Sequence, residues 1–300
     1  MTALPNPLHP DFLYLFVFGP AIGETVLLRV PPDQWVIIDS FKCAKRPAAE
    51  FIVSRYGGQV AAIVLTHPHA DHYPGILELI DTHISAVLGC VHPKDSGPAG
   101  RLHVDASIAL KQRSKPTYVR IWDEWQAVPA RRWDTFRSKE QTFGTAKFIP
   151  LHPVRPIHRA SWSDEANEIS SAMLVEWEGL RLLLGADVPN TQWPGIAADF
   201  PALADHHAMK IPHHGSREAI HDAFGIGLDT RTWVVTPYQR QGLPRAEDFA
   251  PNPADGPEGL VRILAHVREV HLTSLPFRHD READAPCATT RADIRDNRRP

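Results

Sequence analysis

Three histidines and one aspartate fall within six consecutive positions of this chain, at His67, His69, Asp71 and His72. Imidazole nitrogen and carboxylate oxygen are ligands that suit Zn²⁺ and neighbouring divalent metals. Side chains at i and i+2 of an extended segment point the same way, so His67 and His69 can share one metal ion. We expect Asp71 and His72 to face a second ion. The pattern therefore predicts two divalent cations, with Zn²⁺ favoured and Mn²⁺ as the alternative.

The segments on either side of this cluster place it on a loop. The apolar run 60–65 predicts a buried strand, and residues 76–80 have the apolar spacing of a helix. Tyr73-Pro74-Gly75 lies between the cluster and that helix and is typical of a turn. The cluster therefore lies between the carboxyl end of a strand and the start of a helix.

Apolar runs and turn residues define the other expected elements. The first three strands are short and closely spaced, which predicts an antiparallel meander, and a strand–helix–strand rhythm then indicates an α/β layer arrangement. Strands are expected at 12–18, 25–30, 34–38, 60–65, 85–89, 146–151, 169–177, 180–184, 208–212, 232–236 and 270–273. Helices are expected at 47–56, 76–80, 104–114 and 259–266, with a short helix or loop at 200–207.

Composition is that of an ordinary globular protein. A chain of 300 residues can bury a large core in one domain, and a net charge of −3 gives no global field for nucleic acid. The apolar run 12–18 is too short to span a membrane and has no basic segment before it, so we expect a strand and a cytoplasmic protein. Cys43, Cys90 and Cys287 are odd in number and widely spaced. They argue against a disulfide framework and for a reducing compartment.

The spacing His67-x-His69-x-Asp71-His72 resembles the H-x-H-x-D-H signature of the metallo-β-lactamase family. The resemblance implies an α/β fold, the four-layer αββα sandwich that holds one or two metals. We expect one such domain over residues 1–277, with an insertion at about 91–145, and a charged, mobile tail at 278–300. The arginines and tryptophans of the insertion fit packing against the sandwich better than stacking on single-stranded bases.

The same resemblance implies further ligands at two strand ends. Asp187 matches the bridging aspartate of the family, and the pair His213-His214 matches the last histidine ligand. By similarity to phosphorylcholine esterases, His214 is assigned to the metal and His213 to the substrate. Asp39, after an early strand, is either an ordinary turn residue or a carboxylate that orients a ligating histidine from behind.

One departure from the family pattern points to a subgroup. Asn167 stands where many members carry a third ligand histidine. Phe148–Pro153, Asn167 with Ser170, Gly185–Asp187 and Lys210–Ser216 together resemble the metallo-β-lactamase domain of the ComEC DNA-uptake proteins. That resemblance implies hydrolysis of phosphodiester bonds, with a nuclease as the type activity. The histidine that such domains carry after the next strand is absent here, and Arg240 is the alternative contact.

We therefore expect a metal-dependent phosphodiesterase. His67 and His69 hold one cation, Asp71, His72 and His214 hold the other, and Asp187 bridges them. The cations lower the pKa of a water molecule, which attacks phosphorus in line. The predicted catalytic residues are Asp71, His213 as acid or oxygen ligand, and Asn167 as oxygen donor, with Asp39, His152, Ser216 and Lys210 around them.

Two alternatives remain open. One is hydrolysis of a lactone, lactam or thioester at the same site, and the other is a degenerate metal-binding scaffold or regulatory subunit. The expected partner is a phosphodiester substrate, with single-stranded DNA or a nucleotide as the candidates. The sequence predicts no membrane span and gives no oligomeric state.

Overall fold

The computed structural model describes most of the chain. The described residues are 6–20, 22–43, 45–90, 117–135, 139–153, 166–216, 221–224, 231–238, 242–244, 269–274 and 289–292. The expected helices at 104–114 and 259–266, and Arg240, lie outside these ranges.

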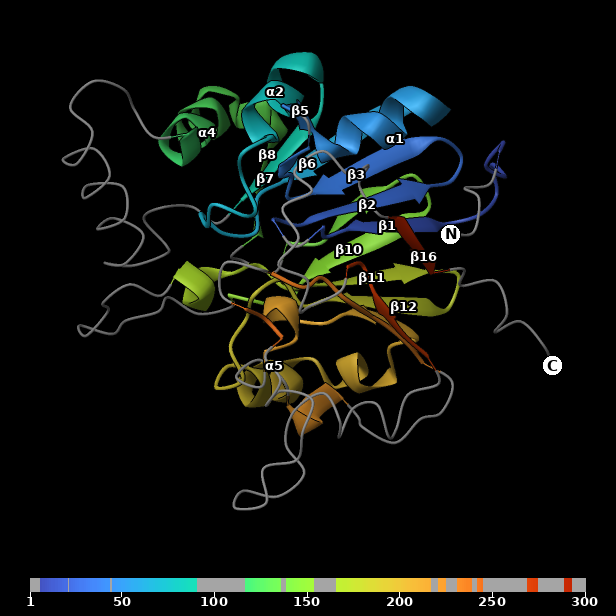
Figure 1. Ribbon diagram of the computed structural model, residues 1–300, viewed down its shortest axis with the longest axis vertical. Helices are drawn as coiled ribbons and strands as arrows, with labels where there is room; N and C mark the ends of the chain where they lie inside the picture. The colour runs from blue at the N-terminus through green and yellow to red at the C-terminus, as the bar shows by residue number, and fades with distance from the viewer. Residues whose placement is uncertain are drawn as a thin grey trace.

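Two mixed sheets packed face to face form the centre of the described fold (Figure 1). The first contains, in spatial order, β16 (Thr289–Ala292), β1 (Tyr14–Phe18), β2 (Thr25–Val30), β3 (Gln34–Ile38), β6 (Gln59–Val64), β7 (Val87–Cys90) and β8 (Arg132–Asp134). The second contains β15 (Glu269–Leu272), β14 (Thr232–Val235), β13 (Ala208–Lys210), β12 (Leu180–Leu184), β11 (Met173–Trp177), β10 (Ala146–Pro150) and β9 (Gln141–Phe143). A small ribbon consists of β4 (Lys42–Cys43) and β5 (Arg46–Pro47).

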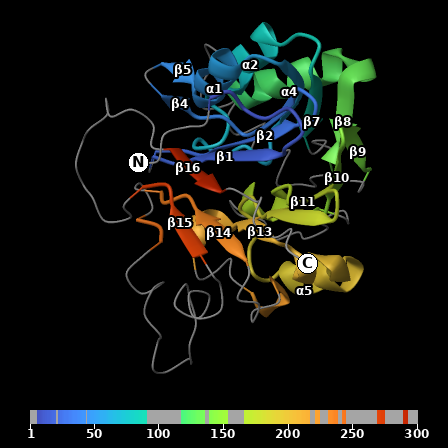
Figure 2. The same cartoon turned by 90° about the vertical axis from the view of Figure 1, so that its right-hand side faces the viewer.

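Helices cover the outer face of each sheet, which gives four layers (Figures 1 and 2). The first sheet is covered by α1 (Ala48–Tyr56), α2 (Ile76–Thr82) and α4 (Thr117–Ala127), and the second by α5 (Trp193–Asp199). Short 3-10 turns are η1 (Pro129–Arg131), η3 (Ala166–Ile169), η4 (Pro201–Asp205), η5 (His213–Gly215) and η7 (Asp222–Phe224). The predicted αββα sandwich is confirmed.

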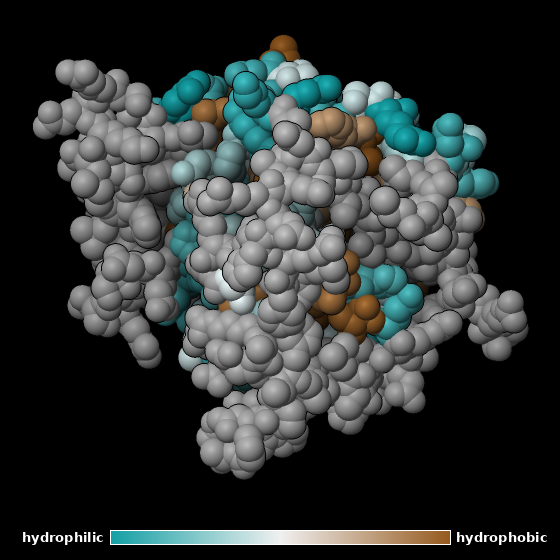
Figure 3. All heavy atoms as spheres, in the orientation of Figure 1, coloured by the Kyte–Doolittle hydropathy of each residue, from teal (hydrophilic) through white to brown (hydrophobic). Residues whose placement is uncertain are grey.

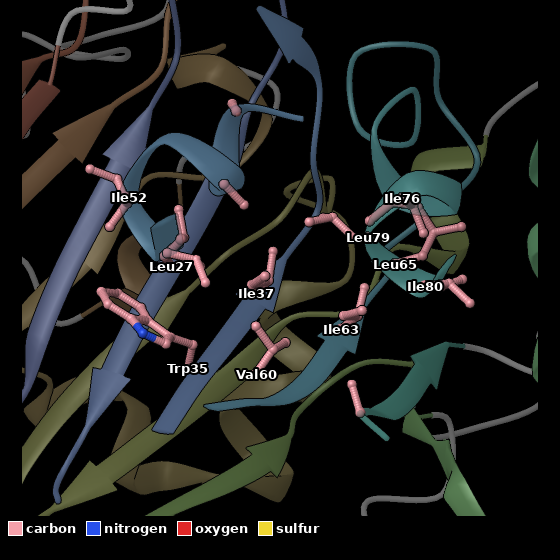
Figure 4. Close-up of a cluster of buried hydrophobic side chains, with 14 of the residues drawn as sticks. Leu27, Trp35, Ile37, Ile52, Val60, Ile63, Leu65, Ile76, Leu79 and Ile80 are labelled. Carbon is pink, nitrogen blue, oxygen red and sulfur yellow. The ribbon is translucent and has the colours of Figure 1, made fainter. Parts of the chain in front are cut away.

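Alternating side chains explain why both faces of each sheet are covered. Val36 and Ile38 of β3 point between the sheets, whereas Trp35 and Ile37 pack under the helices of the first layer (Figure 4). Strand β12 repeats this pattern, because its Leu183 belongs to the cluster under α5 and its neighbours to the central one. Since successive side chains of a strand point to opposite faces, apolar runs without alternation require cover on both sides.

Parallel pairing brings several strand ends to one edge of the sandwich. Strand β3 is parallel to β6, and β12, β13 and β14 are parallel to one another. The loops that follow β3 and β6, and those that follow β12 and β13, therefore begin side by side at the carboxyl ends of the strands. Ligands bind at these ends in open α/β sheets. These loops carry the residues that were singled out from the sequence.

Three segments differ from expectation. Part of the expected insertion belongs to the sandwich, because β8 pairs with β7 and β9 with β10. Trp133 of β8 is buried in the central core, so the charge of its neighbours concealed a strand. The expected mobile tail contains β16, which pairs with the edge of β1. Helix α5 was missed because Pro194 and Gly195 resemble a loop, whereas proline is favoured in a helix's first turn.

The cysteines also differ from expectation. Cys43 is disulfide-bonded, whereas Cys90 is a buried free thiol. The argument from the cysteine count against disulfides is therefore wrong for Cys43, because an odd count says nothing about any one pair.

Polar side chains lie over the helices of the first sheet on the face of the molecule that Figure 3 shows. Figure 3 shows mainly hydrophilic side chains around α1 and α2. Among the described residues, no helix combines the length and apolar character that a membrane crossing requires.

A buried histidine under the second sheet makes the fold sensitive to acid. His206 donates from Nδ1 to the Leu203 carbonyl at 2.8 Å and accepts at Nε2 from the Trp233 indole at 3.0 Å. A second ring proton would face the indole N–H, so the neutral form is required. Burial lowers the pKa of His206 to about 3.

We expect acid to destabilise the metal-free fold through this residue. Between pH 6.5 and about 3 the unfolded chain binds a proton that native His206 does not, so stability falls as pH falls. His206→Gln should reduce the pH slope of the unfolding free energy by up to about 1.4 kcal/mol per pH unit. Urea unfolding of both proteins at pH 6.5, 5.5 and 4.5 measures it, and equal slopes would contradict the assignment.

Candidate metal centre

The cluster of histidines and carboxylates lies where four strands end. Asp39 follows β3, the loop of His67 to His72 follows β6, Asp187 follows β12, and His214 follows β13. All of these side chains are buried, except that His69 is half-buried. Residues that are far apart in the sequence therefore meet in one interior site.

Two sets of side chains are close enough to hold a cation each. Within each set, one ligand atom per residue lies within 4.8 Å of all the others. The first set is Asp71, His72, Asp187 and His214, and the second is His67, His69 and Asp187. Glu24, Asp39 and His72 form a third such set, but Asp39 occupies the other nitrogen of His72.

Asp187 joins the first two sets through one oxygen. Its Oδ2 lies 3.8 Å from His67 Nε2, 3.5 Å from His72 Nε2 and 3.6 Å from His214 Nε2. Asp71 Oδ2 lies 3.3 Å from His72 Nε2 and 2.9 Å from His214 Nε2. A carboxylate oxygen among three imidazole nitrogens from two loops has a position that would suit a bridging ligand.

Orphaned polar atoms support a cation at this position. Nε2 of His67 and Nε2 of His72 are buried and have no hydrogen-bond partner among the described residues. Buried polar atoms in proteins are almost always partnered, so each orphan requires an explanation. Divalent cations satisfy imidazole and carboxylate lone pairs together, and the residues present fit such ions.

Hydrogen bonds on the far side of the rings direct the Nε2 atoms inward. His72 donates from Nδ1 to Asp39 Oδ2 at 2.7 Å, and His214 donates from Nδ1 to the Thr236 carbonyl at 2.7 Å. His67 Nδ1 lies 3.0 Å from Thr66 Oγ1 and 3.2 Å from Ser170 Oγ. A proton fixed on Nδ1 leaves the Nε2 lone pair for a metal.

Asp39 supports both halves of the histidine loop. Besides His72, it accepts the Thr66 backbone N–H at 2.8 Å and the Thr66 hydroxyl at 2.6 Å. The Thr66 hydroxyl in turn touches His67. Burial raises the pKa of Asp39, and the His72 charge with these hydrogen bonds opposes that rise. The structure thus places Asp39 behind the ligands, where the second sequence interpretation expected it.

The site concentrates charge away from water. Burial alone would raise the pKa values of Asp71 and Asp187, but the neighbouring His72 and His214 hold both well below their ordinary range. Burial opposes protonation of His72 and His214, and the carboxylates beside them raise both pKa values. The negative charge of the carboxylates can therefore be balanced either by protons on the histidines or by metal cations. Metal binding then releases those protons.

The structure separates the two adjacent histidines. His214 is buried against Asp71, whereas His213 is half-buried, with Nε2 3.3 Å from Asn167 Nδ2. Both lie in η5 with positive φ, at 44° and 54°, rather than at the end of a strand. Asp39 and Ala186 also have positive φ. Non-glycine residues in this region store strain that commonly clusters at functional sites.

The remaining predicted residues take supporting positions. His152 donates from Nδ1 to the Ser170 carbonyl at 2.8 Å, and burial lowers its pKa to about 4. Ser216 closes the η5 turn by donating its N–H to the His213 carbonyl. Lys210 is fully buried and faces Glu24 and the Ala186 carbonyl, so it does not project into solvent.

Three residues at the site had no assigned role in the sequence analysis. Ser170 accepts the Asp187 N–H at 3.0 Å and contacts His67, so it links two ligand loops. The Thr66 hydroxyl bonds to Asp39 and contacts the His67 ring, so it links these two residues. Glu24 was overlooked, although an acidic residue directly before a mainly apolar strand is a usable signal.

Comparison with known proteins agrees with this geometry. The model of the metallo-β-lactamase superfamily matches residues 19–161. The match covers just under half of the chain and includes the histidine loop, and the observed sandwich is the metallo-β-lactamase fold. No curated protein sequence matches the chain.

Several solved structures resemble the chain at low identity. A metallo-β-lactamase with a HARLDQ motif from Cronobacter sakazakii is 16% identical, with 72% of this chain and 79% of that chain covered and a TM-score of 0.42. Igni18, a metallo hydrolase from Ignicoccus hospitalis, is 12% identical, with 94% and 98% covered and a TM-score of 0.47. CmlA, a diiron β-hydroxylase from Streptomyces venezuelae, is 13% identical, with 90% and 45% covered and a TM-score of 0.45.

The shared position of Asp187 predicts how metal content responds to mutation. Asp187→Ala should lower occupancy of both cations, because the residue belongs to both sets. His69→Ala should lower only the ion held by three residues, which we also expect to be the weaker one. Elemental analysis of protein purified without chelator measures both effects. Asp81→Asn, an exposed change on α2, is the control that should leave metal content unchanged.

Two results would contradict this assignment. One is full occupancy of the ion at His67 and His69 with the other set empty. The second is unchanged metal content in Asp187→Ala.

Proposed function

We propose that this protein is a metal-dependent hydrolase of phosphodiester bonds, similar in substrate class to the ComEC-like metallo-β-lactamase domains. The observation that carries the proposal is the pair Asn167 and His213, whose side chains meet at 3.3 Å beside the metal-binding set. Asn167 stands where many family members have a third histidine. The site thereby exchanges a metal ligand for a polar group suited to a phosphate oxygen.

The contact between Asn167 and His213 determines which ring nitrogen of His213 carries the proton. In this orientation the Asn167 amide donates to Nε2 of His213, so the proton of the neutral ring is on Nδ1. The rings of His213 and His214 lie 6.2 Å apart, so His213 is next to the metal set without belonging to it. In the proposed reaction His213 holds a non-bridging oxygen or protonates the leaving group.

The other residues hold and orient the cations. His67, His69 and Asp187 would hold one ion, and Asp71, His72, His214 and Asp187 the other. Bound divalent ions supply water of lowered pKa and neutralise charge on the phosphate. Asp39, Thr66 and Ser170 fix the ring orientations, which limits reorganisation during turnover.

A substrate panel tests the proposal against its alternatives. Purified protein with Zn²⁺, Mn²⁺ or Mg²⁺ is assayed on single-stranded DNA, duplex DNA, RNA, bis-p-nitrophenyl phosphate, a lactone, a β-lactam and a thioester. We expect turnover of a phosphodiester and loss of it in Asp71→Ala. Turnover confined to the lactone, lactam or thioester would contradict the proposal and favour hydrolysis of those bonds. Bound metal without turnover of any substrate in the panel would favour a metal-binding scaffold.

His213 and His214 should respond differently to mutation. His214→Ala should lower both metal content and rate, because its Nε2 faces Asp71 in the metal set. His213→Ala should keep the metal and lower the rate by about 10²–10⁴-fold. The loss should shrink on bis-p-nitrophenyl phosphate, whose leaving group needs little protonation.

Metal content and rate are compared for both variants on an activated and an unactivated phosphodiester. Loss of metal in His213→Ala with retention in His214→Ala would reverse the two roles. Equal rate losses on both substrates would remove His213 as the acid.

A further inference from the structure

A buried ion pair joins the two sheets directly behind the metal-binding sets. Glu24 precedes β2 of the first sheet, and Lys210 ends β13 of the second. Lys210 Nζ lies 2.5 Å from Glu24 Oε2, and both side chains are at most 2% exposed. A buried pair of this kind rarely adds net stability, because desolvation offsets the attraction, so its position requires another explanation.

Lys210 reaches the bridging carboxylate and the backbone beside it. Its Nζ donates to the Ala186 carbonyl at 3.2 Å and lies 3.8 Å from Asp187 Oδ1. The same carbonyl accepts the His213 N–H at 2.9 Å, so the two ligand loops meet there. Oδ2 of Asp187 faces the three imidazoles, and Lys210 therefore attracts the oxygen that points away from them.

Glu24 connects the Asp71 loop with the loop of His214. Its backbone N–H donates to the Asp71 carbonyl at 2.9 Å. Its Oε2 accepts the Thr236 hydroxyl at 2.6 Å, and the Thr236 carbonyl is the atom that receives Nδ1–H of His214. The pair thus contacts the loops of Asp71, Asp187 and His214, which come from both sheets.

We propose that Glu24 and Lys210 are positioning residues, which hold Asp187 and His214 in register with Asp71 so that the four-residue metal set forms across the two sheets. The inference rests on the proposed metal centre and does not depend on the substrate. Removal of a residue that supports a metal ligand typically lowers the metal affinity by about 10–100-fold. We expect an effect of this size from loss of the pair.

The test separates positioning from folding. Glu24→Gln/Lys210→Met removes both charges, which leaves no unpaired buried charge. Thr236→Val removes the hydroxyl that donates to Glu24 and lies 3.3 Å from His214 Nδ1, and it changes no charge. Glu50→Gln is the control, because it removes a carboxylate that pairs with His83 at 2.8 Å between α1 and the end of α2. Readouts are the Tm of the metal-free protein and zinc affinity by competition with a chromophoric chelator.

We expect metal-free Thr236→Val and Glu50→Gln to melt close to the wild type. Zinc affinity should fall by about 10–100-fold in the double variant, fall less in Thr236→Val and stay unchanged in Glu50→Gln. A folded double variant with wild-type zinc affinity would overturn the proposal. Should the double variant not fold, unchanged zinc affinity in Thr236→Val would overturn it. A wild-type protein that binds no zinc would instead remove the metal centre itself.

Discussion

Four carboxylates buried at one edge of the sandwich are the constraint on which the site depends. Glu24, Asp39, Asp71 and Asp187 are each at most 5% exposed. Buried carboxylates are costly unless they are paired and hydrogen-bonded. The surrounding histidines, Lys210, backbone N–H groups and hydroxyls meet that requirement in part. The Nε2 atoms of His67 and His72 remain without a hydrogen-bond partner among the described residues, and each belongs to one of the two metal-binding sets.

The fold supplies this arrangement by bringing strand ends together. Parallel pairing of β3 with β6, and of β12 with β13, directs four loops to one edge, and three apolar layers hold the sheets in place. The ligands themselves contribute little apolar contact to those layers. Core packing therefore fixes the backbone, while the hydrogen bonds of Asp39, Ser170, Thr236 and Glu24 fix the rings and carboxylates.

The local sequence pattern was sufficient to predict the layers of the sandwich and the position of the histidine loop. Strands β2 and β3 have the predicted bounds, because turn residues flank continuous apolar runs. Strands β8 and β16 were missed because charged residues and threonine at a sheet edge carry no alternating pattern. Glu24 and Lys210 form an ion pair although they lie far apart in the sequence. No short sequence motif predicts such a contact. His152 is a similar case, since its side chain bonds to the backbone carbonyl of Ser170, 18 positions away, and no sequence motif predicts such a contact.

Anomalous diffraction at the zinc absorption edge tests the account most directly. Crystals of the whole chain grown with Zn²⁺ would be measured above and below that edge. The account predicts one peak enclosed by Asp71, His72, Asp187 and His214, and a weaker one between His67, His69 and Asp187. Absence of zinc from both positions, in crystals that hold it elsewhere on the chain, would contradict the account.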